Sequence, residues 1–334
     1  MTSSPTPSPT PPSQAPQLSI IIVSYNTRDM TLKCLRTLFD NLGRISAEVW
    51  VVDNASRDNS VEAIRQEFPS VHVIANEGNA GFGEANNQAM KQARGEWFLL
   101  LNSDAFVQAG AIETLIEYSK AHPEAGVVGP KLLNADGSMQ RSCYRFPSPS
   151  HSWRENFWIS SLVPPSSRWS DLRRWPHDEE RQVDFVIGAC LLLRREVFEQ
   201  VGGFDERFWM YSEETDWQQR MARKGWKVMF VPQAVVTHLG GASGVNEKVR
   251  VNESFFESLD FYQWKHYGVR GLVSMRLAMA CGSSLRTVLW TLAAFVPSKR
   301  KQARAKSKMQ AWLVLRQLTR WKVPHKDLRG KAAS

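Results

Sequence analysis

The sequence has little of what marks several classes of protein. Its 334 residues contain only four cysteines, which are scattered without a CxxC pair. We therefore expect reduced thiols in a cytoplasmic setting, with neither a disulfide framework nor a zinc site. The N-terminal segment has neither the charged start nor the apolar stretch of a secretory signal, so we expect none. Hydrophobic residues still make up 43% of the chain, as in a globular protein.

Acidic residues are scarce near the C-terminus. The net charge is +9, and residues 298–334 contain twelve Lys or Arg and one acid, so the rest of the chain carries a net charge of −2. This distribution argues against a nucleic-acid-binding core. It indicates a basic C-terminal segment that meets phosphate-rich surfaces.

Three regions follow from composition and pattern. Residues 1–17 contain only Met, Thr, Ser, Pro, Gln and Ala, which predicts disorder. In residues 18–245, apolar strands alternate with helical patterns, which predicts an α/β sheet flanked by helices. Residues 246–334 predict a helical, basic and amphipathic region. The expected strands lie at 18–23, 48–52, 71–75, 98–101 and 227–231, and the first two helices at 29–42 and 60–68.

Polar residues follow two of the buried strands. Asp53 ends the second strand, and Asn102, Ser103 and Asp104 follow the strand at 98–101. Ligands bind at the carboxyl ends of strands in an open α/β sheet, so both carboxylates are expected in one crevice. Asp53 then suits a nucleobase or ribose hydroxyl, and Asp104 suits a divalent cation on a diphosphate. The alternative for both is a local turn, which Asn, Ser and Asp also favour.

Four motifs in this order resemble the inverting family 2 glycosyltransferases. They are Ser24-Tyr25-Asn26, VVDNASRDNS at 51–60, NAGFGEANN at 79–87 and LLLNSDA at 99–105. A Gly-Ala pair at 188–189, GGFDE at 202–206 and EETD at 213–216 extend the resemblance to about residue 241. It implies a GT-A (Rossmann-like) fold, with a mixed sheet flanked by helices, and a nucleotide-diphosphate sugar donor. The pattern is most similar to the rhamnosyltransferase-like branch, which uses dTDP-L-rhamnose on lipid-linked or polysaccharide acceptors of the bacterial cell envelope.

The resemblance also implies roles for individual residues. Glu214 is the expected base, at a position where the family more often has Asp, and Glu213 or Asp216 is expected to position the acceptor. Repulsion among these three acids is expected to raise one pKa towards working pH. Their alternative is the acidic first turn of a helix. The expected donor-binding residues are Ser24, Tyr25, Asn26, Asp53, Asn79, Gly81, Phe82, Asn86, Asn102, Ser103 and Asp104.

A divalent metal, Mg²⁺ or Mn²⁺, is implied in the same way. Asp104 matches the last acid of the family's metal-binding triplet, whose first position is Asn102 here, so the motif is one carboxylate short. His238 matches a histidine that completes the metal shell in some members. A lone histidine is otherwise more often structural.

The C-terminal region leaves two interpretations open. Trp312, Leu315 and Leu318 lie among Lys and Arg, so the segment either rests on an anionic membrane surface at the inner face of the cytoplasmic membrane or caps the α/β region. Residues 271–297 are apolar but interrupted by Arg276 and Arg286, so we expect no membrane span. For the whole chain, other nucleotide-sugar donors, a nucleotidyltransferase and a non-catalytic nucleotide-sugar-binding scaffold remain the alternatives.

Overall fold

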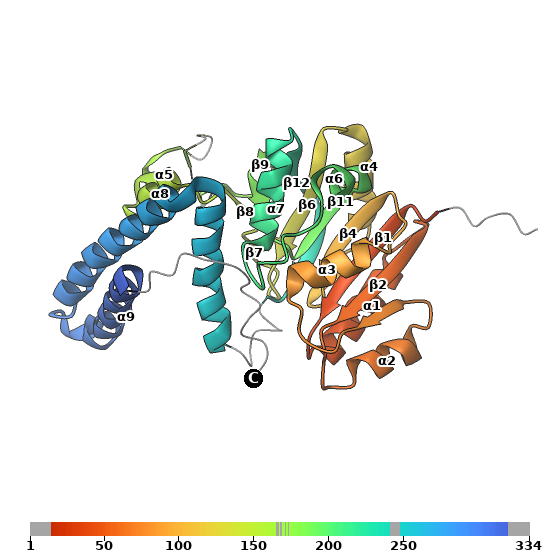
Figure 1. Cartoon of the computed structure of the whole chain (residues 1–334), viewed down its shortest axis with the longest axis horizontal. Coiled ribbons are helices and arrows are strands. Elements are labelled where there is room, and N and C mark those ends of the chain that lie inside the picture. The colour runs from red at the N-terminus through yellow and green to blue at the C-terminus, as the bar shows by residue number, and fades with distance from the viewer. Residues whose placement is uncertain are drawn as a thin grey trace, which may run out of the picture.

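The computed structural model describes residues 15–319, apart from 165–166, 168, 171, 173 and 241–247. An α/β part is followed by a helical part that extends away from it (Figure 1). The predicted disorder of residues 1–17 falls almost entirely outside the described residues, as does the basic segment after Thr319.

The α/β part contains twelve described strands and seven α-helices. Its first half consists of β1 (Leu18–Ser24), α1 (Arg28–Asp40), β2 (Ala47–Asp53), α2 (Ser60–Glu67), β3 (His72–Ala75), α3 (Phe82–Met90), β4 (Trp97–Asn102), β5 (Ala105–Val107), α4 (Ala111–Ala121) and β6 (Ala125–Leu133). Its second half consists of β7 (Met139–Gln140), β8 (Cys143–Tyr144), α5 (Pro149–Asn156), the 3₁₀ helix η1 (Ile159–Leu162), β9 (Arg181–Val183), β10 (Phe185–Val186), β11 (Cys190–Arg194), α6 (Arg195–Val201), α7 (Glu213–Arg223) and β12 (Lys227–His238).

The main sheet is mixed, as predicted. Its order is β3-β2-β1-β4-β11-β6-β12-β5, with β7 beside β6 and β9 beside β12, while β8 and β10 form a separate pair. Strands β1 to β4 run parallel, and β11 is antiparallel to both β4 and β6. The carboxyl ends of β1, β2 and β4 therefore meet at one edge of the sheet.

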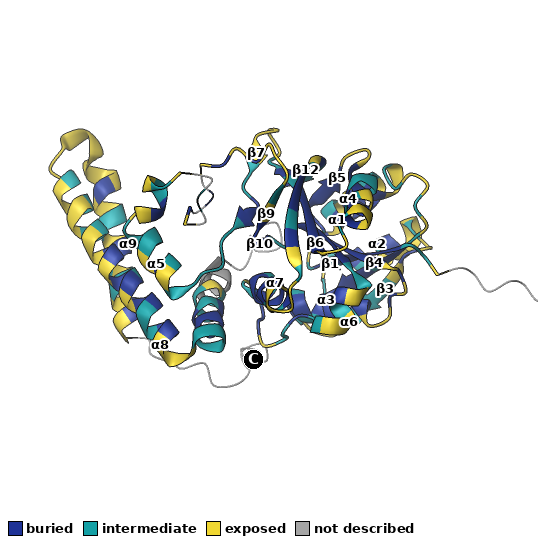
Figure 2. Cartoon of the chain, turned by 90° about the horizontal axis from the view of Figure 1, so that it is seen from above, coloured by how far each residue is buried: buried dark blue, intermediate teal, exposed yellow. Residues whose placement is uncertain are grey.

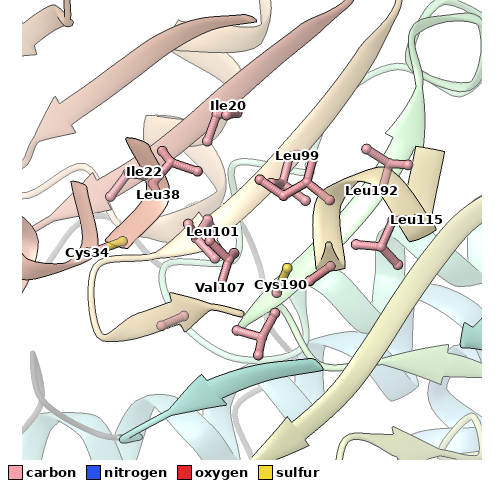
Figure 3. Close-up of a cluster of buried hydrophobic side chains, with 14 of the residues drawn as sticks. Ile20, Ile22, Cys34, Leu38, Leu99, Leu101, Val107, Leu115, Cys190 and Leu192 are labelled. Atoms are coloured by element: carbon pink, nitrogen blue, oxygen red, sulfur yellow. The ribbon is translucent and has the colours of Figure 1, made fainter. Parts of the chain in front are cut away.

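The central strands are buried on both faces because their apolar runs are continuous. In β1, Ile20 and Ile22 pack into one cluster while Ile21 packs into another on the opposite face. Helices α1 and α4 cover the first cluster, where Leu38 and Leu115 approach the strands (Figure 3). Helices α3, α6 and α7 cover the second. Each buried Leu or Ile contributes about 1.5–3 kcal/mol relative to exposure.

Strand β12 is longer than the predicted 227–231. Its pairing with β6 is irregular between Val231 and Val235, and Pro232 in this stretch lacks the N–H that a regular ladder needs. Pairing resumes after the irregularity and continues to His238. The sequence pattern stopped at the proline, whereas the strand continues past it.

The helical part consists of α8 (Lys248–Ala293), the 3₁₀ helix η3 (Pro297–Lys299) and α9 (Arg300–Thr319). Helix α8 bends sharply at Gly268, whose φ of +66° is unusual for other residues (Figure 1). Beyond the bend it continues through Gly282, where a Cβ would lie only 2.7 Å from the Cβ of Asn156 in α5. Among the described residues, no helix is both long and apolar enough to cross a membrane.

The cysteines form no disulfide, as expected. Cys34, Cys143 and Cys190 are buried, and Cys281 is exposed on α8. Burial raises the pKa of the Cys143 and Cys190 thiols to about 12, so neither is a thiolate at neutral pH.

Candidate active site

The ends of three parallel strands bring the first predicted residues together. Ser24 at the end of β1 pairs in register with Asp53 of β2, and Val23 of β1 pairs with Asn102 of β4. The shared edge that the sequence predicted for Asp53 and Asp104 is therefore present.

The two carboxylate oxygens of Asp53 differ in their hydrogen bonding. Oδ1 accepts a hydrogen bond of 2.9 Å from the backbone N–H of Ser56, which is the turn interaction considered from the sequence. Oδ2 is buried and has no hydrogen-bond partner within the described structure. Leaving a buried acceptor unpaired costs roughly 1–3 kcal/mol, so Oδ2 is suited to accept a hydrogen bond from a ligand. The turn and the binding role are compatible, because each uses a different oxygen.

The loop after β1 is fixed to the loop after β2. Asn26 adopts a φ of 52°, its backbone N–H donates to Ser56 Oγ at 2.8 Å, and its Oδ1 accepts from the Arg57 N–H at 2.8 Å. Ser24 Oγ lies 3.0 Å from Thr31 Oγ1, inside the first helix turn. Tyr25 is half-buried between them. Asn26 therefore joins the two loops, and Ser24 fixes the end of β1 to the start of α1.

Asp104 and His238 meet where β4 and β12 end. The Nε2 atom of His238 lies 3.3 Å from Asp104 Oδ1 and 3.3 Å from Asn102 Nδ2. Its Nδ1 lies 2.7 Å from Gln140 Oε1, which orients the ring. Asp104 and His238 are both buried, and Ser103 Oγ lies 3.2 Å from Thr27 Oγ1.

The pair has the donor atoms of a divalent-metal site but is incomplete alone. Among the described residues, no group of three or more His, Cys, Asp or Glu side chains is placed to hold a metal ion. Mg²⁺ commonly takes one or two carboxylates and draws its other ligands from phosphates and water, and imidazole suits Mn²⁺ better. Asp104 and His238 therefore fit a metal that the diphosphate of a ligand helps to hold.

Two asparagine side chains fix the glycine-rich loop that precedes α3. Asn54 Nδ2 donates to the Gly81 carbonyl at 3.1 Å, and Asn79 Oδ1 accepts from the Gly81 N–H at 2.9 Å. Gly81 has a φ of +84°, and a Cβ there would collide with the carbonyl of Trp209. Asn86 is buried, and its Nδ2 donates to the Phe82 carbonyl one turn earlier in the same helix.

Phe82 and Gly188 connect the sheet edge to α7. A Cβ on Gly188 would lie 3.3 Å from the Phe82 ring and 3.8 Å from the Cβ of Glu214. The next residue, Ala189, accepts a hydrogen bond of 2.9 Å from the Asn102 N–H. The turn at 188–189 thus lies between Glu214 and the Asn102 end of β4.

Helix α7 begins with two buried acids. Glu213 is almost fully buried, Glu214 is half-buried, and the Oε2 atom of each lacks a hydrogen-bond partner in the described structure. Burial raises the pKa of both carboxyls, and the charge of Glu214 raises that of Glu213 further. Tyr211 and Ser212 before them have φ values of 69° and 64°, a strained pair of the kind found at functional sites.

Asp216 lies on a different side of α7, where it contacts α8. It has no exposed surface, and its Oδ1 is 2.5 Å from Lys265 Nζ and 2.7 Å from His266 Nε2, both on α8. Its Oδ2 accepts from Arg220 Nε at 2.9 Å. Burial opposes ionisation, but these three partners hold the pKa of Asp216 below its usual value. The acids therefore do not act as a repelling triplet, and the position of Asp216 favours a structural role over acceptor positioning.

Sequence reasoning missed three residues that support the site. Gln140 orients His238, Lys265 neutralises Asp216, and the Trp209 carbonyl accepts from the Phe82 N–H at 3.3 Å. Trp209 lies only four residues before Glu213, which was a usable signal. Gln140 and Lys265 are distant in sequence from the residues they contact, and no local pattern marks them.

Two family models match the chain. The one described as glycosyl transferase family 2 matches residues 19–202, which is more than half of the chain. Another, described as the N-terminal domain of galactosyltransferase, matches residues 177–240, a range that contains α7 and β12.

Known relatives agree with these matches. An N-acetylglucosaminyl-diphospho-decaprenol L-rhamnosyltransferase of Mycobacterium tuberculosis is 31% identical over 296 residues, which cover 80% of this chain and 94% of the relative. The low-salt glycan biosynthesis hexosyltransferase Agl10 of Haloferax volcanii is 26% identical over 213 residues, covering 62% of each chain.

Solved structures show the fold. The mannosyltransferase PcManGT of Pyrobaculum calidifontis, in complex with GDP-Man and Mn²⁺, superposes with a TM-score of 0.53 at 18% identity, covering 93% of this chain and 89% of that one. GalNAc-T7 with UDP, GalNAc and Mn²⁺ gives a TM-score of 0.52 at 20% identity, covering 75% and 50%. The predicted GT-A arrangement, a mixed sheet flanked by helices, is thereby confirmed.

Proposed function

The chain belongs to glycosyl transferase family 2, and we propose that it moves L-rhamnose from dTDP-L-rhamnose to a hydroxyl of a lipid-linked glycan in the synthesis of a bacterial cell envelope. The observation that carries the choice of sugar and acceptor is the 31% identity, over 80% of this chain, to a protein named as a rhamnosyltransferase of a decaprenol-linked N-acetylglucosamine. The buried acids at the start of α7 and the Asp104–His238 pair support transfer from a nucleotide diphosphate.

We assign Glu214 as the base. In an inverting transfer, the acceptor oxygen forms a bond to the anomeric carbon on one face while the bond to the diphosphate oxygen breaks on the other. Glu214 takes the hydroxyl proton, and the bonding electrons leave with the nucleoside diphosphate. Burial raises the pKa of Glu214, which makes its carboxylate a stronger proton acceptor. Glu213, adjacent and also buried, is assigned to hold the acceptor.

The sheet edge is assigned to the donor. Asp53 Oδ2, buried and without a partner in the described structure, accepts a hydrogen bond from the base or ribose. Gly81 and Phe82 border the donor site on the side of α7. Asp104 and His238 would hold a Mg²⁺ or Mn²⁺ ion. When bound, such an ion offsets the negative charge that develops on the leaving diphosphate.

We also propose that the transfer takes place at the inner face of the cytoplasmic membrane. A lipid-linked acceptor keeps its reactive hydroxyl close to a bilayer surface. An enzyme that associates with this surface therefore encounters its substrate by diffusion along the membrane. The basic residues of the helical part provide the attraction to anionic lipid headgroups.

Binding and turnover test this function separately. Calorimetry with a panel of nucleotide sugars, in Mg²⁺, Mn²⁺ or EDTA, should show selective, metal-dependent binding of dTDP-L-rhamnose. Incubation with an N-acetylglucosaminyl diphospholipid should then release dTDP, and NMR of the product should show inversion at the anomeric carbon. Selective binding of a different nucleotide sugar would show that dTDP-L-rhamnose is not the donor. Binding without release of nucleoside diphosphate would indicate a non-catalytic scaffold.

A further inference from the structure

The second half of α8 and α9 form a hairpin that exposes a large set of apolar side chains. We define this hairpin as residues 269–319. The two helices pack along each other and extend away from the sheet, with α5 against α8 (Figure 1). In a surface helix of a globular protein, the apolar stripe normally faces the core and the polar residues face water. Here polar pairs join the two helices and many large apolar side chains are exposed, although Leu272, Met275 and Ala278 are among the apolar residues that stay buried.

The interior of the hairpin contains a buried charge cluster. Arg276 Nη2 lies 2.6 Å from Asp260 Oδ2, and its Nε lies 3.2 Å from Asp260 Oδ1 across the bend of α8. Arg316 of α9 approaches the same carboxylate at 3.9 Å. Arg286 Nε donates to the buried Gln310 of α9 at 3.1 Å. Polar pairing thus fixes α9 against α8.

Both helices have long exposed sides (Figure 2), and large apolar residues lie on them along α8 and in the second half of α9. On α8, successive exposed positions are three or four residues apart and form one stripe, in which Val288 is 56% and Leu292 is 59% exposed. On α9, Trp312 is 50% and Leu315 is 61% exposed. We call these residues the apolar face: Leu277, Cys281, Leu285, Val288, Leu289, Leu292, Phe295, Val296, Met309, Trp312, Leu315 and Leu318. An exposed set of this extent marks an interaction surface.

Cations adjoin the apolar face, and carboxylates are absent from it. Residues 261–319 contain eleven Lys or Arg and no Asp or Glu. Lys301, Arg304 and Lys308 are exposed. The spacing of Lys301, Lys308, Trp312 and Leu315 places them on one side of α9, with cations in its first half and apolar residues in its second.

We propose that the apolar face rests on an anionic lipid bilayer, with Val288, Leu292 and Trp312 at the boundary between headgroups and acyl chains and Lys301, Arg304 and Lys308 on lipid phosphates. This specifies the surface for the membrane location proposed above and rests on that proposal. The combination of apolar anchors with Lys and Arg is the pattern of helices that lie in a membrane interface. The Asp260–Arg276 pair stays on the inner side, where charged groups of membrane-bound helices also lie.

Charge complementarity distinguishes the bilayer from a second copy of the chain. Two hairpins packed face to face would bring their cations together with no carboxylate between residues 261 and 319 to neutralise them. Like charges opposed across an interface cost several kcal/mol. Anionic phosphates instead attract the cations that adjoin the apolar face. The face therefore fits a lipid surface better than a homodimer.

The position of the exposed cysteine allows a direct test on the full chain. Cys281 lies within the apolar face, whereas Cys34, Cys143 and Cys190 are buried, so an environment-sensitive fluorophore can be attached selectively to Cys281. With vesicles of phosphatidylcholine and phosphatidylglycerol, its emission should shift to shorter wavelength and gain intensity. Vesicles of phosphatidylcholine alone should give a much weaker change, and added salt should reduce the binding.

Two sets of variants separate the charge and the apolar contributions. Lys301→Glu, Arg304→Glu and Lys308→Glu together should weaken binding to anionic vesicles at least about a hundredfold, from roughly fivefold for each lost cation. Val288→Ser with Leu292→Ser should weaken it about tenfold or more. A control with the same change of charge, Arg44→Glu, Arg65→Glu and Lys224→Glu, alters exposed residues of the α/β part and should bind as wild type.

Separate experimental outcomes test the proposed membrane-binding face and the proposed enzymatic function. If the control weakens vesicle binding as much as the hairpin variant, or if Val288→Ser with Leu292→Ser abolishes a dimer seen in sedimentation while vesicle binding is unaffected, the proposed face is wrong. Turnover is measured in parallel with a short-chain, water-soluble acceptor. Wild-type turnover without vesicle binding would overturn the face alone, and vesicle binding without turnover would overturn the proposed function alone.

Discussion

Replacing Asp216 by Asn should destabilise the protein rather than disable its chemistry. The carboxylate is fully buried and is contacted by Lys265, His266 and Arg220 at 2.5, 2.7 and 2.9 Å. Removing one partner of a buried ion pair typically costs about 3–5 kcal/mol. Lys265 keeps a second contact of 2.7 Å with Asp205, so we expect the lower end, about 3 kcal/mol.

The dependence on pH identifies the carboxylate as the source of the effect. Because the pKa of Asp216 is lowered in the folded state, its contribution to stability is complete above the unfolded pKa of about 3.9 and is lost as the pH falls further. Urea unfolding at pH 7 should therefore give the full difference between wild type and Asp216→Asn. The difference should shrink progressively below about pH 4, since the Asn side chain does not titrate.

A double-mutant cycle with Lys265→Met measures the coupling. We expect an interaction free energy of about 1–3 kcal/mol between positions 216 and 265. Lys224→Met, which changes an exposed lysine at the end of α7, is the matched control and should stay within about 0.5 kcal/mol of wild type. A variant Asp216→Asn with normal stability at pH 7 and a tenfold or larger rise in KM for the acceptor would refute this reasoning and support the acceptor-positioning role instead.

Three further changes test the site. Glu214→Gln should keep donor affinity in calorimetry while turnover falls roughly 10²- to 10⁴-fold; a loss of donor binding would contradict its assignment as base. Asp104→Ala should abolish the metal dependence of donor binding, and an unchanged metal titration would remove Asp104 from the metal site. Gly81→Ala places a side chain at a φ of +84° and against the Trp209 carbonyl, so both the melting temperature and donor affinity should fall, whereas Gly78→Ala, in open space, serves as the control.

The sheet edge was predictable because its signals are local. A continuous apolar run predicts a buried strand, and the polar residue at its end lies at the carboxyl edge whatever the rest of the chain does. This reasoning brought Asp53 and Asp104 to one edge, and the register of β1 with β2 and β4 places Asp53 and Asn102, two residues before Asp104, at that edge. Gln140 follows no such rule, since its contact with His238 depends on how β6, β7 and β12 pair.

The grouping of the three acids was wrong in one respect that helical geometry explains. Glu214 and Asp216 are two residues apart, and at about 100° per residue their side chains point to nearly opposite sides of α7. Glu214 therefore faces Gly188 and Phe82, while Asp216 faces α8. Proximity in sequence suggested shared chemistry, but the period of the helix separates the two residues.

The amphipathic pattern of α9 could be predicted from the sequence, but the side of the helix that packs against α8 could not. Trp312, Leu315 and Leu318 were expected to form one side of an amphipathic helix, and they do lie exposed. Which side packs on a neighbour depends on what that neighbour offers. Helix α8 presents Asp260 and Arg286, so α9 turns Arg316 and Gln310 towards it.

Support for α7 crosses the boundary at residue 245 that the sequence suggested between two regions. Glu213 and Glu214 each have a buried oxygen without a partner among the described residues, and Tyr211 with Ser212 holds a strained backbone, so the start of α7 is locally unfavourable. Ion pairs from α8 to Asp216, three residues after Glu213, offset this cost. A chain ending at 245 would leave Asp216 with Arg220 as its remaining cation among those contacts. The first half of α8 is therefore better regarded as part of the framework that holds the acids in place, whereas the proposed membrane contact belongs to the hairpin beyond Gly268.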